Sequence, residues 1–253
     1  MSRDQAAYFD QAQPYLEETA DRRVRRIQAF LATGLRDRAR AGQAPPAVAL
    51  DVGCGPGAML ATLPAETRKV GVDIAPALLE RAAAKGIETH NLDLDSQPLP
   101  AADDSCDLVI ATDVIEHVLH TDHLLNEINR VLKIGGLFVA GIPNVNQPAS
   151  FIMQFILDLT PMYAARYRCP HYRDFSARLF KAILRRHGFH VRRCEGSYLF
   201  PFDGFLPGIW LVRQIPRWGA QVLVAAEKQR NEPIPEGYQT NMPDLLAWLT
   251  GTH

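Results

Sequence analysis

Short apolar runs alternate with segments of helical periodicity along the middle of the chain, and this alternation narrows the choice of fold. Runs that could each form one buried strand occupy residues 48–52, 69–73, 87–91, 107–111, 137–142, 190–194 and 221–226. Helices are predicted between most of these runs, at residues 58–63, 75–85, 124–132 and 176–187. Strands that are separated by helices at this spacing pair in parallel through right-handed crossovers. The chain is therefore predicted to form an α/β fold, a doubly wound, seven-stranded and mostly parallel sheet.

The predicted sheet makes up one domain with additional segments around it. An N-terminal helical lid, the domain and a C-terminal tail are predicted at residues 1–46, 47–230 and 231–253. Residues 144–172 and 198–218 carry no strand pattern and are predicted to be insertions in the domain.

Local signals mark several of the helix boundaries. Gly135 and Gly136 are predicted to end the third helix and Gly188 the fourth, because glycine interrupts helical periodicity. Ser176 is predicted to cap the N-terminus of the fourth helix. The lid helix carries a run of arginines that is interpreted as a solvated face: Arg22, Arg23, Arg25 and Arg26.

Composition excludes several classes of protein. The 253 residues carry 27 Lys and Arg against 28 Asp and Glu, so the net charge of −1 gives no general reason to expect a nucleic acid or a membrane partner. A hydrophobic content of 47% favours a folded domain over disorder, and no apolar run reaches the length of a membrane span. The cysteines are far apart without a C-x-x-C pair, which predicts free thiols in a cytoplasmic protein: Cys54, Cys106, Cys169 and Cys194.

The turn after the first predicted strand is rich in glycine. Gly53, Gly55 and Gly57 would let the backbone turn sharply and approach a ligand, at the sheet edge where open parallel sheets bind ligands. Asp73 ends the second strand, where a carboxylate can accept both hydroxyls of a ribose. The G-x-G-x-G spacing differs from the G-x-G-x-x-G diphosphate cradle, which disfavours a nicotinamide-dependent oxidoreductase.

Taken together, these residues resemble the class I S-adenosylmethionine-dependent methyltransferases and are similar to the O-methyltransferases of the ubiquinone pathway. The resemblance is strong over residues 46–146, where it includes the segments 91–95 and 107–117, and weaker over the last strands. It implies S-adenosyl-L-methionine as cofactor and S-adenosyl-L-homocysteine as product.

The resemblance also implies roles for individual residues. The methionine half of the cofactor would be shaped by Asp51, Gly53, Cys54, Gly55 and Gly57. The ribose and adenine would be held by Asp73, Ile74, Asp93 and Leu94, although Asp93 could also be a solvated loop acid, since Asp95 stands two residues on. The transferable methyl group would be bordered by Ala111, Thr112 and Asp113.

The segment after the fourth strand leaves three interpretations open. On a helical turn, Asp113, Glu116 and His117 would face the same way. His117 could be a general base beside the methyl acceptor, and it is the predicted catalytic residue. The three residues could instead bind a metal with His171, as the similar E-x-x-E-H segment of some relatives suggests, or His117 could only line the pocket. No metal is predicted.

The acceptor is predicted to be a small molecule, methylated at oxygen. The lid helix with Tyr8 and Phe9 and the two insertions would cover it, although residues 151–159 could also bury against a second subunit in a homodimer. Residues 166–193 hold nine Lys and Arg against Asp174, which is interpreted as a solvated helix face and not as a nucleic-acid site. A catalytically silent cofactor-binding protein and an RNA-directed methyltransferase are the alternatives.

Overall fold

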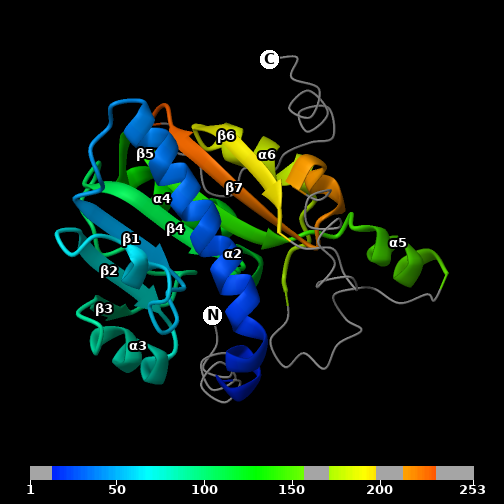
Figure 1. Cartoon of the computed structure of the whole chain (residues 1–253), viewed down its shortest axis with the longest axis horizontal. Coiled ribbons are helices and arrows are strands. Elements are labelled where there is room, and N and C mark those ends of the chain that lie inside the picture. Colours follow the sequence, from blue (N-terminus) through cyan, green and yellow to red (C-terminus); the bar gives the residue numbers. More distant parts are fainter. Residues whose placement is uncertain (1–12, 157–170, 198–212, 232–253) are drawn as a thin grey trace.

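A seven-stranded sheet forms the centre of the protein, whose computed structural model describes residues 13–156, 171–197 and 213–231 (Figure 1). The strands lie in the order β3 (Glu88–Asn91), β2 (Arg68–Asp73), β1 (Val48–Val52), β4 (Cys106–Thr112), β5 (Leu132–Pro143), β7 (Gln221–Lys228) and β6 (Phe189–Gly196). The first five of these strands pair in parallel, whereas β7 is antiparallel to both of its neighbours. The predicted seven-stranded, mostly parallel sheet of an α/β fold is confirmed.

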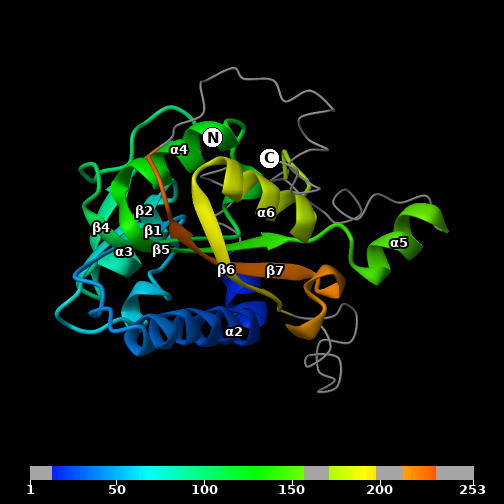
Figure 2. The same ribbon diagram turned by 90° about the horizontal axis from the view of Figure 1, so that it is seen from above.

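The two faces of the sheet carry different helices. Helix α2 (Gln13–Arg40) crosses one face, and helices α4 (Thr121–Val131) and α6 (Ala177–Arg186) cover the other (Figure 2). Two shorter helices are α3 (Pro76–Ala83) and α5 (Pro148–Phe155).

Successive side chains of a strand point to opposite faces of the sheet, and they pack into one hydrophobic core on each face. In β4, Leu108 and Ile110 pack with Phe30 of α2, whereas Val109 packs on the opposite face with Phe180 of α6. The four consecutive residues of β4 from Leu108 to Ala111 are all fully buried, whichever face they point to. Burial on both faces explains why the central strands are continuously apolar in sequence.

Two local predictions on helices are wrong. Residues 58–63 form only a 3-10 turn at Leu60–Thr62, because Pro64 keeps Leu63 extended and Gly57 takes a positive φ of 75°. Helix α4 ends at Val131, before the glycine pair, because Leu132 is already extended and pairs with Cys106 of β4.

The glycine pair lies inside β5. Gly135 has a φ of 73°, and its carbonyl accepts a hydrogen bond from Arg38 Nη1 of α2 at 2.6 Å. The strand is irregular here, since its register to β4 shifts between the partners Cys106 and Leu108. These glycines therefore bend a strand where they were expected to stop a helix.

The fourth predicted helix is confirmed together with its cap. Ser176 Oγ accepts a hydrogen bond from the Leu179 amide at 3.2 Å, and Gly188 follows the helix with a φ of 81°. None of the described helices has the length and apolar character that a membrane span requires.

Candidate functional site

The glycine loop after β1 has the backbone that its sequence predicts. Gly53, Gly55 and Gly57 all take positive φ angles, of 71°, 50° and 75°. A Cβ at Gly53 would lie 2.8 Å from Val114 Cγ2, so the loop lies close against the segment after β4. Among the residues that the structure describes, a Cβ at Gly55 would meet no atom within 4 Å. The loop therefore presents an open side at Gly55, where a ligand can approach the backbone.

Asp73 holds this loop in place from the end of β2. Its Oδ2 accepts from the Gly55 amide at 2.8 Å, and its Oδ1 accepts from the Ala75 amide at 2.9 Å. A carboxylate has about four lone-pair positions, so Asp73 can accept from more donors than these two amides. Ile74 follows, and its carbonyl accepts from Asn91 Nδ2 of β3 at 2.9 Å. The acid that was expected to bind a ribose thus lies directly against the open side of the loop.

Two predicted loop residues are buried. Asp51 is 2% exposed, and burial, with a smaller effect from the charge of Asp73, raises its pKa well above the usual range. Burial also raises the pKa of the Cys54 thiol. A Cβ at Gly71 of β2 would lie 2.7 Å from Cys54 Sγ, so the thiol fills space beside that strand. Any contact of Cys54 with a ligand in the loop would therefore come from its backbone.

The turn after β3 carries two acids with different contacts. Asp93 Oδ1 accepts from the Asp95 amide at 3.0 Å, and Asp95 Oδ1 accepts from the His120 amide before α4 at 2.9 Å. Leu94, between them, is buried. Asp95 therefore positions the start of a helix, whereas the role of Asp93 toward an adenine stays a prediction.

Asp113 connects three elements at the end of β4. It follows the buried Ala111 and the half-buried Thr112, and it takes a φ of 57°, rare for a residue other than glycine. Its amide donates to Gly141 O of β5 at 2.9 Å, and its carboxylate accepts from Gln221 Nε2 of β7 at 2.8 and 2.9 Å. It also forms an ion pair with Arg23 of α2.

Two sequence interpretations are corrected at this point. The expected helical turn from residue 113 is absent, because Asp113 is left-handed and only Ile115–His117 forms a 3-10 turn. Arg23 does not belong to a fully solvated face, since it reaches Asp113. Gln221 gave no signal in sequence, because it begins a strand 108 residues after its partner.

The buried Glu116 and His117 form a cluster with the half-buried His171 beside Asp113. Glu116 is 1% exposed and His117 is 9% exposed. Glu116 Oε1 lies 4.0 Å from His117 Nε2, and the rings of His117 and His171 meet edge to face with centroids 4.5 Å apart. Ligand atoms from the three side chains lie within 4.8 Å of one another, so the cluster could hold a metal ion. Asp113, which was expected to join such a set, is not part of it.

Burial shifts the pKa of two members of this cluster toward their uncharged forms. Burial, with a smaller effect from the charge of Asp113, raises the pKa of Glu116 well above its usual range. Burial and the neighbouring His117 lower the pKa of His171 to about 4. Glu116 Oε2 has no hydrogen-bond partner among the described residues. The arrangement suits the exchange of a proton more than the storage of a fixed charge.

The segments expected to cover an acceptor are described only in part. Tyr8 and Phe9 and most of the two predicted insertions lie outside the described residues. Helix α5 lies apart from the sheet, with Phe151 60% and Phe155 73% exposed (Figure 1). Whether it closes a pocket or contacts a second subunit stays a prediction.

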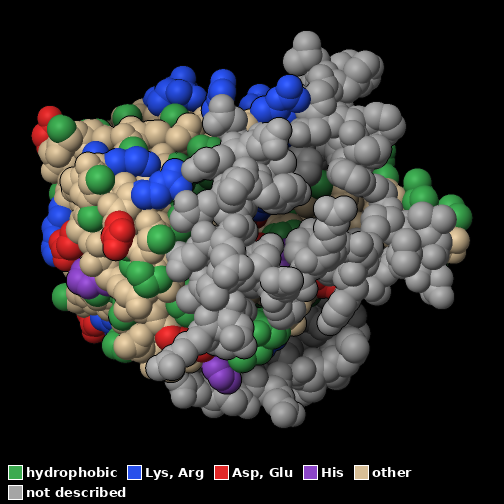
Figure 3. Space-filling model, turned by 90° about the horizontal axis from the view of Figure 1, so that it is seen from below, with side chains coloured by type: hydrophobic (Ala, Val, Ile, Leu, Met, Phe, Trp, Pro, Cys, Tyr) green, Lys and Arg blue, Asp and Glu red, His purple; other side chains and the backbone are tan. Residues whose placement is uncertain are grey.

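Basic side chains gather locally despite the balanced total charge. Figure 3 shows separate groups of Lys and Arg at the margins of one face. On α6, Arg178, Lys181 and Arg185 line a hollow of about 460 Å³ together with Arg217, while Phe180 and Leu184 of the same helix are buried. The helix thus has the predicted amphipathic form.

Comparison with known proteins agrees with this geometry. A family model described as "Methyltransferase domain" matches residues 50–140. An uncharacterised methyltransferase of Mycobacterium leprae is 31% identical over 218 residues, which cover 81% of this chain and 71% of that protein. A malonyl-[acyl-carrier protein] O-methyltransferase of Legionella pneumophila is 33% identical over 120 residues, 45% of this chain and 42% of that protein.

A solved structure shares the fold. An S-adenosylmethionine-dependent methyltransferase from Thermotoga maritima superposes with a TM-score of 0.55 at 20% identity, over 85% of this chain and 98% of that chain.

Proposed function

Because the chain belongs to the S-adenosylmethionine-dependent methyltransferases, we propose that it transfers a methyl group from this cofactor to an oxygen atom of a small-molecule acceptor. The observation that supports this most directly is the open side of the glycine loop at Gly55, with the Asp73 carboxylate against it. The loop and the acid fit a ligand that presents hydroxyl donors to Asp73.

The residues that would hold the cofactor follow from this fit. Asp73 would accept from the ribose hydroxyls, and Ile74 would pack on the adenine. Asp93 and Leu94 would border the adenine from the turn after β3. The remaining contacts, along the methionine half and near the methyl group, would come from Asp51, Gly53, Cys54, Gly55, Gly57, Ala111, Thr112 and Asp113.

When bound, S-adenosylmethionine supplies a methyl group that its positive sulfur already activates. The protein then has to hold the acceptor oxygen in line with the bond that breaks, which is a matter of positioning. A hydroxyl acceptor loses its proton as the oxygen attacks, so a base at this point accelerates the reaction. We assign that proton to a ring nitrogen of His117.

The surroundings of His117 support this assignment. The ring lies at the end of β4, nearly buried, between Glu116 and His171. Burial raises the pKa of Glu116 and lowers the pKa of His171, so both neighbours of the His117 ring favour their uncharged forms. The name of the Legionella relative, an O-methyltransferase, agrees with oxygen as the acceptor atom.

The proposal is tested with a cofactor that carries an isotopically labelled methyl group. The full chain is incubated with hydroxylated small molecules, amines and total RNA, and the label is followed into each fraction. Label in a hydroxylated compound as a methyl ether or ester is the expected result. Label confined to amines or RNA would contradict the proposed acceptor, and cofactor binding without any transfer would favour a catalytically silent protein.

We also propose that residues 1–46 act as a lid over residues 47–230, with residues 231–253 as a separate tail. The contact of Arg23 with Asp113 supports this arrangement, because it places α2 over the end of β4. The insertions at 144–172 and 198–218 would complete the acceptor side.

A further inference from the structure

Helix α2 is attached to the sheet by two different kinds of contact along its length. Ile27, Phe30 and Leu31 are buried and pack with residues of β1, β4 and β5 in one hydrophobic core. On the N-terminal side of this core, Arg23 reaches Asp113 through the ion pair described above. The helix therefore has an apolar anchor and, about one turn before it, a charged attachment.

The charged attachment lies at the side of the sheet where the cofactor is proposed to bind. Asp113 follows β4, and the next residue, Val114, lies close against Gly53 of the glycine loop. Gln28 Nε2 of α2 donates to Ala58 O at 3.0 Å, just after the same loop. Figure 1 shows α2 crossing the sheet obliquely, with its N-terminal end extending beyond the strands. The helix thus bridges the glycine loop and the end of β4.

The ion pair can open at a small cost in free energy. The side chains of Arg23 and Asp113 are 39% and 21% exposed, so water screens part of their attraction. Gln221 Nε2 donates to both carboxylate oxygens of Asp113, at 2.8 and 2.9 Å. Because Gln221 belongs to β7, these hydrogen bonds do not depend on the position of α2. When the pair opens, the carboxylate keeps a donor and the guanidinium gains water.

The apolar anchor limits which part of α2 can move. Withdrawing Ile27 from the core would return a buried side chain to water, which costs about 1.5–3 kcal/mol. Val24 is only partly buried against the same core. Movement at low cost is therefore confined to the helical segment before Ile27, residues 13–26, which is called the gate segment below. Arg23 belongs to this segment.

We propose that the ion pair between Arg23 and Asp113 controls the exchange of the cofactor. With the pair formed, the gate segment covers the glycine loop. With the pair broken, the segment lifts, so that S-adenosylmethionine enters or S-adenosylhomocysteine leaves. Arg23 is a positioning residue for α2 and takes no part in methyl transfer. The gate rests on the proposed placement of the cofactor at Gly55 and Asp73.

A gate changes the rates of binding and leaves the affinity unaltered. Free and liganded protein are both closed for most of the time, so a variant that opens more often raises the association and dissociation rate constants by the same factor. An arginine that contacted the cofactor directly would, when removed, mainly accelerate dissociation and weaken the affinity. The two rate constants measured together therefore distinguish the two roles.

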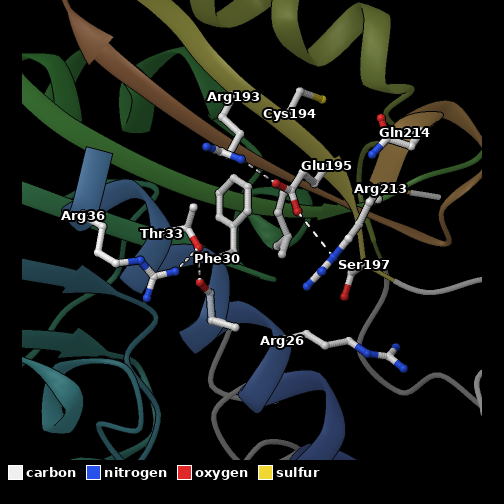
Figure 4. A pocket seen from close by; sticks show the side chains of 13 residues that line it. Arg26, Phe30, Thr33, Arg36, Arg193, Cys194, Glu195, Ser197, Arg213 and Gln214 are labelled. Atoms are coloured by element: carbon white, nitrogen blue, oxygen red, sulfur yellow. Dashed lines mark hydrogen bonds and ion pairs between the residues drawn. The ribbon is translucent and has the colours of Figure 1, made fainter. Parts of the chain in front are cut away.

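Both rate constants are measured by surface plasmon resonance, with S-adenosylhomocysteine on the immobilised full chain. Arg23→Gln should raise each of them about two- to fivefold, the factor that a partly exposed ion pair supplies, and leave Kd unchanged. Arg36→Gln is the matched control, because Arg36 Nη2 donates to Thr33 Oγ1 of the same helix at 2.8 Å, beside the cavity between α2 and β6 (Figure 4). It should leave both rate constants at their natural values.

Salt gives a second readout that needs no variant. Raising the ionic strength from about 0.1 M to about 1 M shortens the Debye length from about 10 Å to about 3 Å, which screens a partly exposed pair. Exchange of S-adenosylhomocysteine should accelerate in the natural chain and in Arg36→Gln toward the rates of Arg23→Gln. The difference between the chains should therefore shrink as salt rises.

Several results would overturn the gate. Equal rate constants in Arg23→Gln and the natural chain would do so, as would a difference that does not depend on salt. A change confined to dissociation would instead assign Arg23 a direct contact with the ligand. No binding of S-adenosylhomocysteine to the natural chain would overturn the proposed cofactor site together with the gate, and this result is distinct from the others. Thermal unfolding of both variants reports whether they are folded.

Discussion

Arg23 of α2 forms an ion pair with Asp113, the residue that follows the central strand β4. The pair ties the long N-terminal helix to the sheet edge where the glycine loop, the histidine cluster and the start of β7 meet. The pair also lies close to Glu116. Burial and the charge of Asp113 raise the pKa of Glu116, and the positive charge of Arg23 offsets part of this shift.

This pair should contribute modestly to stability. Its side chains are 39% and 21% exposed, so solvent screens part of the attraction. A double-mutant cycle with Arg23→Gln and Asp113→Asn should give a coupling energy of about 0.5–1 kcal/mol from urea unfolding. Asn is chosen because it tolerates the left-handed backbone of residue 113. Strictly additive losses would show that the two charges do not interact in solution.

Gly55→Ala should weaken cofactor binding as well as folding. Alanine in a left-handed conformation costs about 1–2 kcal/mol, and here its Cβ would also enter the open side of the loop. Gly42→Ala is the matched control, because Gly42 has a φ of 79° and equally open surroundings, but lies after α2. Both variants should lose similar unfolding free energy. Only Gly55→Ala should lose affinity for S-adenosylhomocysteine, and an equal affinity in the two variants would place the ligand elsewhere.

Asp73→Asn should lower the affinity for S-adenosylhomocysteine by about 10–100-fold, since hydrogen bonds to a charged group contribute about 1.5–3 kcal/mol. The substitution also turns an amide donor toward either Gly55 or Ala75. Asp95→Asn serves as a control, because Asp95 accepts from the His120 amide before α4. It should reduce the melting temperature slightly and leave the affinity unchanged. Calorimetry on both variants decides whether Asp73 binds the ligand.

His117→Asn should lower kcat by about 10²–10⁴-fold while the affinity for S-adenosylhomocysteine stays within a factor of two or so. The reason is that a base acts on the acceptor proton and not on cofactor binding. Loss of both quantities would instead show that His117 only lines the pocket. A chelator separates the third interpretation: kcat that falls on chelation and returns with a divalent ion would assign the cluster of Glu116, His117 and His171 to a metal.

Glu116→Gln should make the protein more stable than the natural chain by an amount that grows as pH rises. A carboxyl whose pKa is raised on folding stabilises fully below its unfolded pKa of about 4.5, and this contribution is lost as pH rises through the folded value. His171 changes the stability in the opposite direction, because its pKa is lowered on folding. Its contribution to the unfolding free energy rises between about pH 4 and 6.5, in the variant and in the natural chain alike. The difference in unfolding free energy between variant and natural chain, measured from pH 4.5 upward, therefore isolates Glu116. A difference independent of pH would contradict its raised pKa.

Sequence patterns predicted the sheet because its strands are buried on both faces. Apolar runs such as residues 107–111 leave no polar alternation that could be mistaken for a loop, and the glycines after β1 need left-handed backbone that other residues avoid. The same patterns could not predict contacts between distant segments. Gln221 meets Asp113 across 108 residues, and Arg23 sits in a run of arginines that looks uniformly solvated.

Two predictions of helix boundaries were wrong because two local sequence signals competed in each segment. Residues 58–63 have helical periodicity, but Pro64 ends the segment before a full helix can form. The glycine pair at 135–136 looks like a helix terminator, whereas pairing with β4 and β7 places it in a strand.

The position of β7 has a consequence for how the protein is made. This strand is the last of the seven in the chain, yet it lies between β5 and β6 in the sheet and pairs with both of them. While the ribosome is still translating residues before Gln221, β6 has no strand to join, and α2 can dock only on the part of the sheet already present. The cofactor loop, built on β1, β2 and β4, can assemble early in translation. Strand β6 can join the sheet only once the eight residues of β7 are available, so this edge of the sheet is completed last.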